Sequence, residues 1–544
     1  MRSVALAFVL VLASVGASAH QAPLIPATPP ALIPSPRSAV FAESGGFVVT
    51  SRTPIVVPGG ADEAVRVGEV LSALIGPGVG VGHPDSLDVQ PLVETGPPRD
   101  GAIVLALTDR ADVQAPEAYA LTVEPAGVRI EAGTAAGLFY GVQTLRQLLP
   151  PEVEYSAARI GPLDVPAVVI LDAPRYPWRG AMLDVARHFF GVAAIEQYLD
   201  HMALYKLNRL HLHLSDDQGW RVEIPGWPRL TTVGAQNEVG GGPGGYLSTA
   251  DYEHLVRYAA DRFITVVPEI DMPGHIHAAL VAHPDLSCDG EPREPYTGIR
   301  VGFSALCVEQ EATYAFLDDV IGALAARTPG AWFHIGGDEV QTLSHEQYAT
   351  FVQRAEALVA AHGKRLVGWD EIAGVPLQPG ATLQLWRPFW DDLTHPDSAR
   401  RARAHAHADA VVGAVEGGAH LILSPADRIY LDMKVDSTTA LGLAWAGYNG
   451  VRDAYDWGET PWLDALPDGA IIGIEAPLWT ETIATVADLE AMAFPRLVGV
   501  AERGWSSRET LDWDDYRVRL ARQAPRWHIL GLNYTRVPEV WNAD

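Results

Sequence analysis

The sequence is poor in basic residues, has only two cysteines, and lacks long apolar runs. It contains 39 Lys and Arg against 67 Asp and Glu, a net charge of −28 that is spread along the chain. Nucleic acid and anionic membrane surfaces would be repelled, so neither is expected as a partner. No run reaches the roughly 20 apolar residues of a membrane helix. The length of 544 residues and the hydrophobic content of 48% indicate two globular domains.

The first residues have the pattern of an export signal. Arg2 gives a positive start, residues 4–15 form a short apolar run, and the small residues 17–19 suit cleavage after Ala19. An N-terminal anchor helix is the alternative interpretation. Because no cysteine lies near the cleavage site, a lipid anchor is not expected. The sequence therefore predicts a signal peptide over residues 1–19 and a secreted, extracellular protein.

Cys288 and Cys307 are the two cysteines. In an exported protein, an even pair close in sequence favours one disulfide. Two buried free thiols are the alternative.

After the signal, the composition of the chain and its pattern of apolar residues change twice. Residues 20–38 are rich in Pro and Ala and predict a mobile linker. Residues 39–170 predict a small α/β domain, with strands near 47–50, 103–107, 119–123 and 127–132 and a helix over 135–149. No polar cluster converges in this domain, so a non-catalytic flank is expected.

Residues 171–544 contain eight short apolar runs separated by helical segments. The runs are 180–184, 210–214, 264–268, 332–335, 365–368, 382–385, 420–423 and 471–474. Eight strand–helix units in one such stretch predict a (β/α)₈ TIM barrel. The fold class is thus an α/β barrel preceded by a smaller α/β domain.

Each apolar run is followed by charged or aromatic residues, and a barrel gathers its active site at the carboxyl ends of its strands. Indole faces pack on sugar rings, while carboxylates and guanidinium groups bind hydroxyls, so this composition is typical of a sugar pocket. In chain order the residues are Arg187, His188, Ser215, Asp216, Asp217, Glu269, Asp271, His275, Asp338, Glu339, Trp369, Asp370, Glu371, Trp386, Tyr430, Asp432, Trp479 and Glu481.

Two other chemistries compete for these residues. His211, His213, Asp216 and His275 could bind a metal, but no further ligand has a spacing typical of zinc, so no metal is expected. A Ser-His-Asp hydrolase is disfavoured because the Gly-x-Ser-x-Gly elbow is missing.

The sharpest local motif is residues 334–339, His-Ile-Gly-Gly-Asp-Glu. Adjacent carboxyl groups in a pocket push their pKa values apart, so one can be a protonated acid while the other is ionised. The two glycines are expected to let the backbone approach a ligand. Asp370 and Glu371 form a rival pair that lacks the glycines.

The sequence resembles glycoside hydrolase family 20, the β-N-acetylhexosaminidases, and especially its secreted actinobacterial chitobiase-type members. The matching blocks are 184–190, 211–220, 268–275, 334–339, 430–432 and 475–481. The resemblance implies exo-hydrolysis of terminal β-linked N-acetylglucosamine or N-acetylgalactosamine, with retention and without a cofactor. Residues 39–170 resemble the non-catalytic domain that precedes this family's barrel.

The resemblance also implies a role for each site residue. Glu339 would protonate the glycosidic oxygen, and the substrate's acetamido oxygen would attack C1, because this family is an exception to the two-carboxylate rule. Asp338 would hold the amide N–H and stabilise the oxazolinium intermediate, and Tyr430 would donate to the amide oxygen. Asp216 and His275 would tune Glu339 for its change from acid to base.

The remaining residues would bind the sugar. The resemblance implies that three tryptophans enclose the acetamido methyl group, Trp369, Trp386 and Trp479. Trp445 would cover the other side of the sugar. Arg187 and Glu481 would bind the 3- and 4-hydroxyls, and Asp432 the 6-hydroxyl.

Three alternatives remain open from the sequence. They are a disaccharide-releasing enzyme of the lacto-N-biosidase kind, a catalytically inactive sugar-binding protein, and a secreted adhesion protein. The expected partner is an oligosaccharide that ends in N-acetylhexosamine. Chitobiose, which would imply a role in chitin degradation, glycoprotein antennae and peptidoglycan fragments all present this sugar.

Overall fold

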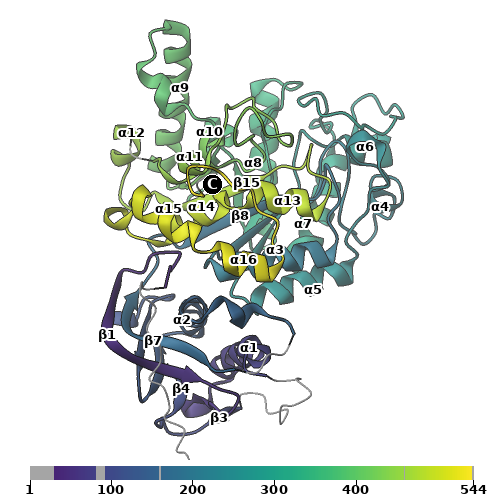
Figure 1. Ribbon diagram of the computed structural model, residues 1–544. Coiled ribbons are helices and arrows are strands. Elements are labelled where there is room, and N and C mark those ends of the chain that lie inside the picture. The colour runs from purple at the N-terminus through teal and green to yellow at the C-terminus, as the bar shows by residue number, and fades with distance from the viewer. Residues whose placement is uncertain (1–29, 81–91, 158–160, 459, 542–544) are drawn as a thin grey trace, which may run out of the picture.

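The computed structural model describes residues 30–80, 92–157, 161–458 and 460–541. They form a smaller N-terminal domain and a larger barrel (Figure 1). The predicted signal peptide, residues 1–19, and residues 20–29 of the predicted linker lie outside the described residues. In the described part of the chain, no helix is long and apolar enough to cross a membrane.

A mixed seven-stranded sheet forms the N-terminal domain, with the order β1-β7-β5-β6-β4-β2-β3. Two helices pack on it and on each other, and bury apolar residues such as Leu71 and Leu138. The elements are β1 (Ser38–Val49), β2 (Ile55–Val57), α1 (Asp62–Gly78), β3 (Val93–Thr95), β4 (Ala102–Leu107), β5 (Tyr119–Glu124), β6 (Gly127–Ala132), α2 (Ala135–Leu148) and β7 (Leu163–Asp172). The four predicted strands and the predicted helix are confirmed. The sequence analysis missed α1, which carries three glycines and a proline, residues that weaken a helix signal.

The prediction of a mobile linker over residues 20–38 is wrong for its described part, residues 30–38. Leu32 and Ile33 are buried, and the Ile33 N–H donates to Gln147 Oε1 at 2.8 Å. The Ser35 N–H donates to Glu502 Oε2 of the barrel at 3.0 Å. Apolar residues between the prolines thus find buried positions, and Ser38 already begins β1. This segment joins the two domains.

Eight parallel strands close into the barrel in the order β10-β11-β12-β13-β14-β15-β8-β9. Each predicted run overlaps one strand, so the predicted TIM barrel is confirmed. The strands are β8 (Trp178–Asp184), β9 (Arg209–His213), β10 (Thr265–Glu269), β11 (Trp332–His334), β12 (Arg365–Trp369), β13 (Thr382–Leu385), β14 (His420–Leu423) and β15 (Ile471–Leu478).

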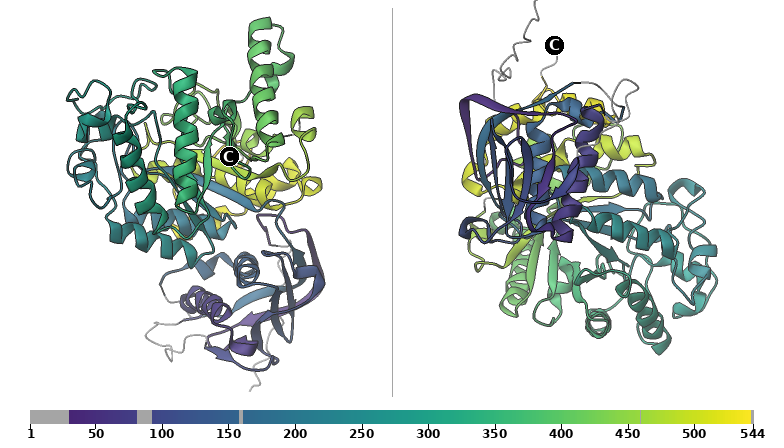
Figure 2. Two further views of the ribbon diagram at one scale, coloured as in Figure 1. Left: turned by 180° about the vertical axis from the view of Figure 1, so that it is seen from behind. Right: turned by 90° about the horizontal axis from the view of Figure 1, so that it is seen from below.

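Helices surround the barrel, and α9 projects beyond the rest of it (Figures 1 and 2). Ser248 and Asp251 form a capping box at the start of α5. The helices are α3 (Val192–Leu204), α4 (Arg229–Thr232), α5 (Thr249–Ala260), α6 (His277–Ala282), α7 (Glu311–Ala325), α8 (His345–Ala361), α9 (Ser398–Glu416), α10 (Ala426–Ile429), α11 (Val451–Tyr455), α12 (Pro461–Asp464), α13 (Val486–Ala493), α14 (Arg496–Trp505), α15 (Trp513–Ala521) and α16 (Ala524–Leu530).

The N-terminal domain packs against the barrel end at which the strands begin. Arg179, near the start of β8, donates to Glu117 at 2.7 Å. Asp172, at the end of β7, accepts from Lys206 at 3.1 Å and from the indole of Trp505 at 3.0 Å, and all three side chains are buried. Breaking such a buried pair is strongly destabilising, so the two domains are firmly joined. The opposite barrel end, where the strands finish, is left open.

Candidate active site

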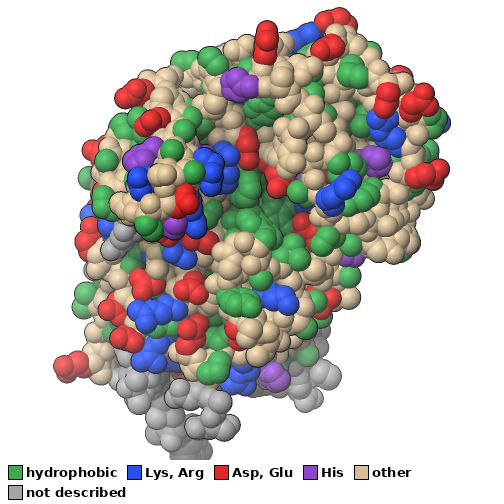
Figure 3. Space-filling model, turned by 90° about the horizontal axis from the view of Figure 1, so that it is seen from above, with side chains coloured by type: hydrophobic (Ala, Val, Ile, Leu, Met, Phe, Trp, Pro, Cys, Tyr) green, Lys and Arg blue, Asp and Glu red, His purple; other side chains and the backbone are tan. Residues whose placement is uncertain are grey.

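A cavity of about 350 Å³ lies at the carboxyl ends of the barrel strands. Figure 3 views the molecule from above and shows a hollow of hydrophobic side chains with acidic side chains beside it. The cavity is lined by Arg187, Ile299, Val301, Asp338, Glu339, Trp386, Tyr430, Asp432, Leu443, Trp445, Trp479 and Glu481. Side chains that follow strands far apart in sequence therefore meet at one site, as the strand-end argument predicted.

Asp338 and Glu339 follow β11 through two glycines in left-handed conformation, Gly336 (φ 67°) and Gly337 (φ 96°). A Cβ atom on Gly336 would lie 1.9 Å from Asp271 Oδ1. The Gly337 N–H donates to the same oxygen at 3.1 Å. Gly336 therefore allows close packing against Asp271, rather than the close approach of a ligand that the sequence suggested.

His275 lies behind the cavity and contacts both carboxyl groups. Its Nε2 is 3.4 Å from Glu339 Oε2 and 3.7 Å from Asp338 Oδ2. Its Nδ1 is 3.3 Å from Asp216 Oδ1, and Asp216 Oδ2 pairs with Arg187 at 2.7 Å. Burial opposes charge on the imidazole, but the carboxylates of Asp216 and Asp338 raise the pKa of His275 well above its usual value. A buried cation thus faces the carboxyl pair.

The two adjacent carboxyl groups have different surroundings. The Asp338 side chain is 12% exposed and that of Glu339 is 32% exposed. Burial and repulsion by Glu339 outweigh the attraction of His275 and raise the pKa of Asp338 to about 6. Asp338 Oδ1 is buried and accepts no hydrogen bond from the described residues. It can therefore accept one from a ligand in the cavity.

Aromatic rings form the wall of the cavity. Trp386 and Tyr430 are stacked with ring centroids 6.4 Å apart, and Trp445 lies edge-on to both, at 5.8 and 5.9 Å. Tyr430 is 6.3 Å from Trp479, and the Arg187 guanidinium lies 4.7 Å from the Trp479 ring. These rings offer flat apolar faces of the kind that pack against a sugar.

Trp369 belongs to the same cluster but does not line the cavity. Its ring is 1% exposed and lies 5.6 Å from Trp479, and its indole N–H donates to Glu269 at 3.0 Å. The structure therefore places Trp369 behind Trp479, and its contact with a sugar stays a prediction.

Besides Asp338 Oδ1, three polar atoms at the cavity have no hydrogen-bond partner among the described residues, Asp432 Oδ1, Glu481 Oε2 and Arg187 Nε. Burial and repulsion by Glu481 raise the pKa of Asp432 well above its usual range. Burial also raises the pKa of Glu481, although Arg187 opposes this shift. Buried polar atoms normally have partners, so these groups are suited to ligand hydroxyls.

The rival pair, Asp370 and Glu371, is occupied by other contacts. Asp370 pairs with Arg387 at 2.6 Å, and Glu371 accepts from the Trp386 indole at 3.0 Å. Neither residue lines the cavity. This pair therefore orients the aromatic wall.

His211 and His213 point into the barrel core. His211 lies between Glu269 at 3.0 Å and Glu475 at 2.8 Å, and His213 Nε2 is 3.0 Å from Asp216. Ligand atoms of His211, Glu269 and His334 lie within 4.8 Å of one another. His211 hydrogen-bonds to Glu269, and His334 accepts from the Gly336 N–H, so these groups have structural partners. The expectation of no metal stays a prediction.

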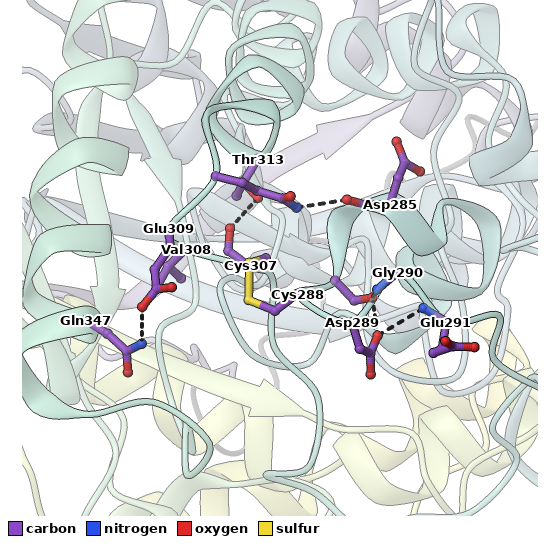
Figure 4. The surroundings of a disulfide bond; sticks show 12 residues. Asp285, Cys288, Asp289, Gly290, Glu291, Cys307, Val308, Glu309, Thr313 and Gln347 are labelled. Carbon is purple, nitrogen blue, oxygen red and sulfur yellow. Dashed lines mark hydrogen bonds between the residues drawn. A yellow bond between two sulfur atoms is a disulfide. The ribbon is translucent and has the colours of Figure 1, made fainter.

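The sequence analysis missed three lining residues, Ile299, Val301 and Leu443. Ile299 and Val301 belong to a segment closed by a disulfide between Cys288 and Cys307 (Figure 4), which confirms the predicted pair. Their apolar side chains stand in a segment rich in Gly, Pro and charged residues, the one signal that could have identified them.

A closed parallel barrel that brings a carboxyl pair and an aromatic wall to one small cavity is the arrangement of a carbohydrate-cleaving hydrolase. The family model described as "Glycosyl hydrolase family 20, catalytic domain" matches residues 176–508, and that of "Glycosyl hydrolase family 20, domain 2" matches residues 29–173. The chain belongs to glycoside hydrolase family 20, as the sequence resemblance implied.

Individual relatives agree with this assignment. The chain is 44% identical to a β-N-acetylhexosaminidase of Cellulomonas fimi, over 94% of this chain and 97% of that protein. A GH20 β-N-acetylhexosaminidase structure from Streptomyces coelicolor has a TM-score of 0.86 at 48% identity, over 94% of this chain and 99% of that one. A mutant Streptomyces plicatus β-hexosaminidase in complex with its product, GlcNAc, has a TM-score of 0.87 at 48% identity, over 96% and 99%.

Proposed function

We propose that this chain is an exo-acting β-N-acetylhexosaminidase that removes one terminal β-linked N-acetylglucosamine or N-acetylgalactosamine with retention. The observation that carries the proposal is the buried, unpartnered Oδ1 of Asp338 beside Glu339, in a cavity walled by Tyr430 and tryptophan. One carboxyl group can bind an amide N–H while its neighbour transfers a proton. The named relatives from Cellulomonas and Streptomyces support the same activity.

The size of the cavity supports release of a single sugar. About 350 Å³ is at the small end of ligand pockets, and tryptophan and tyrosine rings line its wall. Arg187, Asp432 and Glu481 offer polar atoms for the hydroxyl groups of that sugar. A disaccharide-releasing enzyme would need a longer pocket.

The mechanism assigns the nucleophile to the substrate. Glu339 protonates the glycosidic oxygen, and the C1–O bond breaks as the acetamido oxygen attacks C1. Asp338 accepts a hydrogen bond from the amide N–H and stabilises the positive oxazolinium ring. The Tyr430 hydroxyl donates a hydrogen bond to the attacking oxygen. Glu339 then removes a proton from a water molecule. The oxygen of this water attacks C1, and the bond from C1 to the acetamido oxygen breaks, so that the ring opens. Two inversions at C1 give overall retention.

His275 and Asp216 support the change of Glu339 from acid to base. The buried His275 cation, 3.4 Å from Glu339, favours the carboxylate that forms when the proton leaves. Asp216 stabilises that cation, and Arg187 and His213 orient Asp216. None of these groups needs to touch the sugar ring to have this effect.

The proposal includes export and a natural substrate class. The N-terminal signal pattern and the Cys288–Cys307 disulfide support an extracellular protein that acts on chitin fragments or similar glycans. A cleaved N-terminus after Ala19 in culture medium would support export, and retention of the full chain in the cell would contradict it.

The activity is tested with p-nitrophenyl N-acetyl-β-glucosaminide, its galactosamine analogue and N,N′-diacetylchitobiose, with Glu339→Gln as the matched control. We expect the wild type to release the monosaccharide, and NMR to show the β-anomer first. No hydrolysis of any substrate would indicate an inactive sugar-binding protein, and an α-anomer product would contradict retention. Release of only disaccharides would favour the lacto-N-biosidase alternative.

A further inference from the structure

His275 has a backbone conformation that few non-glycine residues adopt. Its φ of 49° lies in the left-handed region, and its imidazole must nevertheless reach Asp216 at 3.3 Å and Glu339 at 3.4 Å. Such a conformation persists only when the surrounding structure fixes it. The groups that fix this turn therefore control the alignment of His275 with Glu339.

Two side chains outside the cavity hold the peptide groups that follow His275. The Ile276 N–H donates to Ser304 Oγ at 3.0 Å, and the His277 N–H donates to Asp217 Oδ1 at 3.0 Å. The Ser304 hydroxyl donates to the same Asp217 oxygen at 2.5 Å. Asp217 is 1% exposed and Ser304 is 6% exposed, so water does not readily replace these bonds.

Asp217 also holds the other partner of His275. Its backbone N–H donates to Asp216 Oδ1 at 2.5 Å, and this is the oxygen that faces His275 Nδ1. One residue thus fixes both the turn at His275 and the carboxylate that stabilises its charge.

Ser304 belongs to the segment 288–307 that the disulfide closes. The same segment supplies Ile299 and Val301 to the cavity wall, and its Leu306 N–H donates to Pro273 O, two residues before His275, at 2.9 Å. The segment therefore contacts the turn on both sides of His275.

We propose that Ser304 and Asp217 are positioning residues that hold the His275 turn, so that the imidazole stays aligned with Glu339 during proton transfer. This inference rests on the proposed function, because it concerns the acid of that reaction. Neither residue lines the cavity, and the polar and aromatic residues that we assign to the sugar lie outside segment 288–307. Loss of either side chain should therefore impair proton donation more than substrate binding.

Two substrates that differ in their leaving group distinguish a positioning role from a general structural role. Departure of a sugar needs a proton from Glu339, whereas 2,4-dinitrophenolate leaves without one. In Ser304→Ala we expect kcat/KM on N,N′-diacetylchitobiose to fall about 10- to 100-fold, at the low end of general-acid effects. With the 2,4-dinitrophenyl glycoside, kcat/KM should change less than about threefold, because it reports only the steps up to departure of the leaving group and not the ring opening in which Glu339 is the base. KM on N,N′-diacetylchitobiose should change equally little.

Three further variants complete the experiment. Ser304→Thr keeps the hydroxyl and should restore most of kcat/KM on the disaccharide, and Asp217→Ala should repeat the selective loss. Ser287→Ala is the matched control, because Ser287 is a buried serine that flanks the same segment and bonds elsewhere. Its hydroxyl lies 2.7 Å from both Pro284 O and Asp289 Oδ1 and accepts from the Gly290 N–H and Arg293, not from the His275 turn. This variant should behave as the wild type.

Parallel loss on both substrates in Ser304→Ala and Asp217→Ala, including loss through unfolding, would show a merely structural role and overturn the inference. Unchanged activity on both substrates would overturn it as well. A wild type that hydrolyses neither substrate would instead overturn the proposed function itself.

Discussion

His275 Nε2 lies 3.4 Å from Glu339 Oε2, and both residues have left-handed backbone conformations, with φ of 49° and 52°. Each such conformation costs about 1–3 kcal/mol in a non-glycine residue, and such strain clusters at functional sites. Here two strained residues from different strand ends meet at one contact. The fold therefore holds a buried cation against the side chain that we assign as the acid.

Glu339→Gln should retain ligand binding but lose most turnover of N,N′-diacetylchitobiose, by about 10²–10⁴-fold, because Gln cannot donate a proton. The kcat/KM of a 2,4-dinitrophenyl glycoside should be much less affected, because its leaving group departs without a proton. Steady-state kinetics on both substrates measure this. Near-normal turnover of the disaccharide would show that Glu339 is not the acid.

The pH dependence of activity should report the raised pKa of Asp338. Burial and repulsion by Glu339 raise the pKa of Asp338 to about 6 despite the attraction of His275, and the mechanism needs the ionised form. Activity should therefore be present above this pKa and fall as the pH drops through it. Measured kcat/KM should show this acid limb in the free enzyme, and Asp338→Asn should remove it. If the fall of kcat/KM at low pH persists in Asp338→Asn, another group causes it.

The disulfide should contribute to stability. Cys288 and Cys307 are 19 residues apart, and closing a loop of this size stabilises a fold by about 3 kcal/mol in the chain-entropy model. Equilibrium denaturation of the double Cys→Ser variant should show a loss of that order. Non-reducing peptide mapping of the exported protein should recover the two cysteines in one linked peptide pair. Two alkylatable thiols would refute the bond.

The barrel and most of the site could be predicted because parallel barrel strands are buried on both faces. They read as continuous apolar runs, and the residues that follow each run must meet at one end of the barrel. This rule placed Arg187, Glu339, Tyr430 and Glu481 at one cavity. Residues such as Ser304 follow no strand and gave no comparable signal.

Other features depend on tertiary contacts that local patterns do not reveal. Helix α1 is stabilised by burial of Val67, Leu71 and Ile75 despite weak helix formers. Leu32 is buried although its segment is rich in proline. Gly336 was interpreted as a ligand contact, but its neighbour is the Asp271 carboxylate, a partner 65 residues away in sequence. Ile299 reaches the cavity from a segment held by the disulfide.

The central claim is that the substrate's acetamido oxygen is the nucleophile, and binding of a thiazoline analogue of N-acetylglucosamine tests it most directly. The analogue mimics the bicyclic intermediate, so isothermal titration should show far tighter binding than for N-acetylglucosamine, as for other transition-state-like ligands. Asp338→Ala and Tyr430→Phe should reduce this advantage, because both residues act on the acetamido group. As the control, Arg187→Lys should weaken both ligands alike. A thiazoline that binds no better than N-acetylglucosamine would contradict the mechanism.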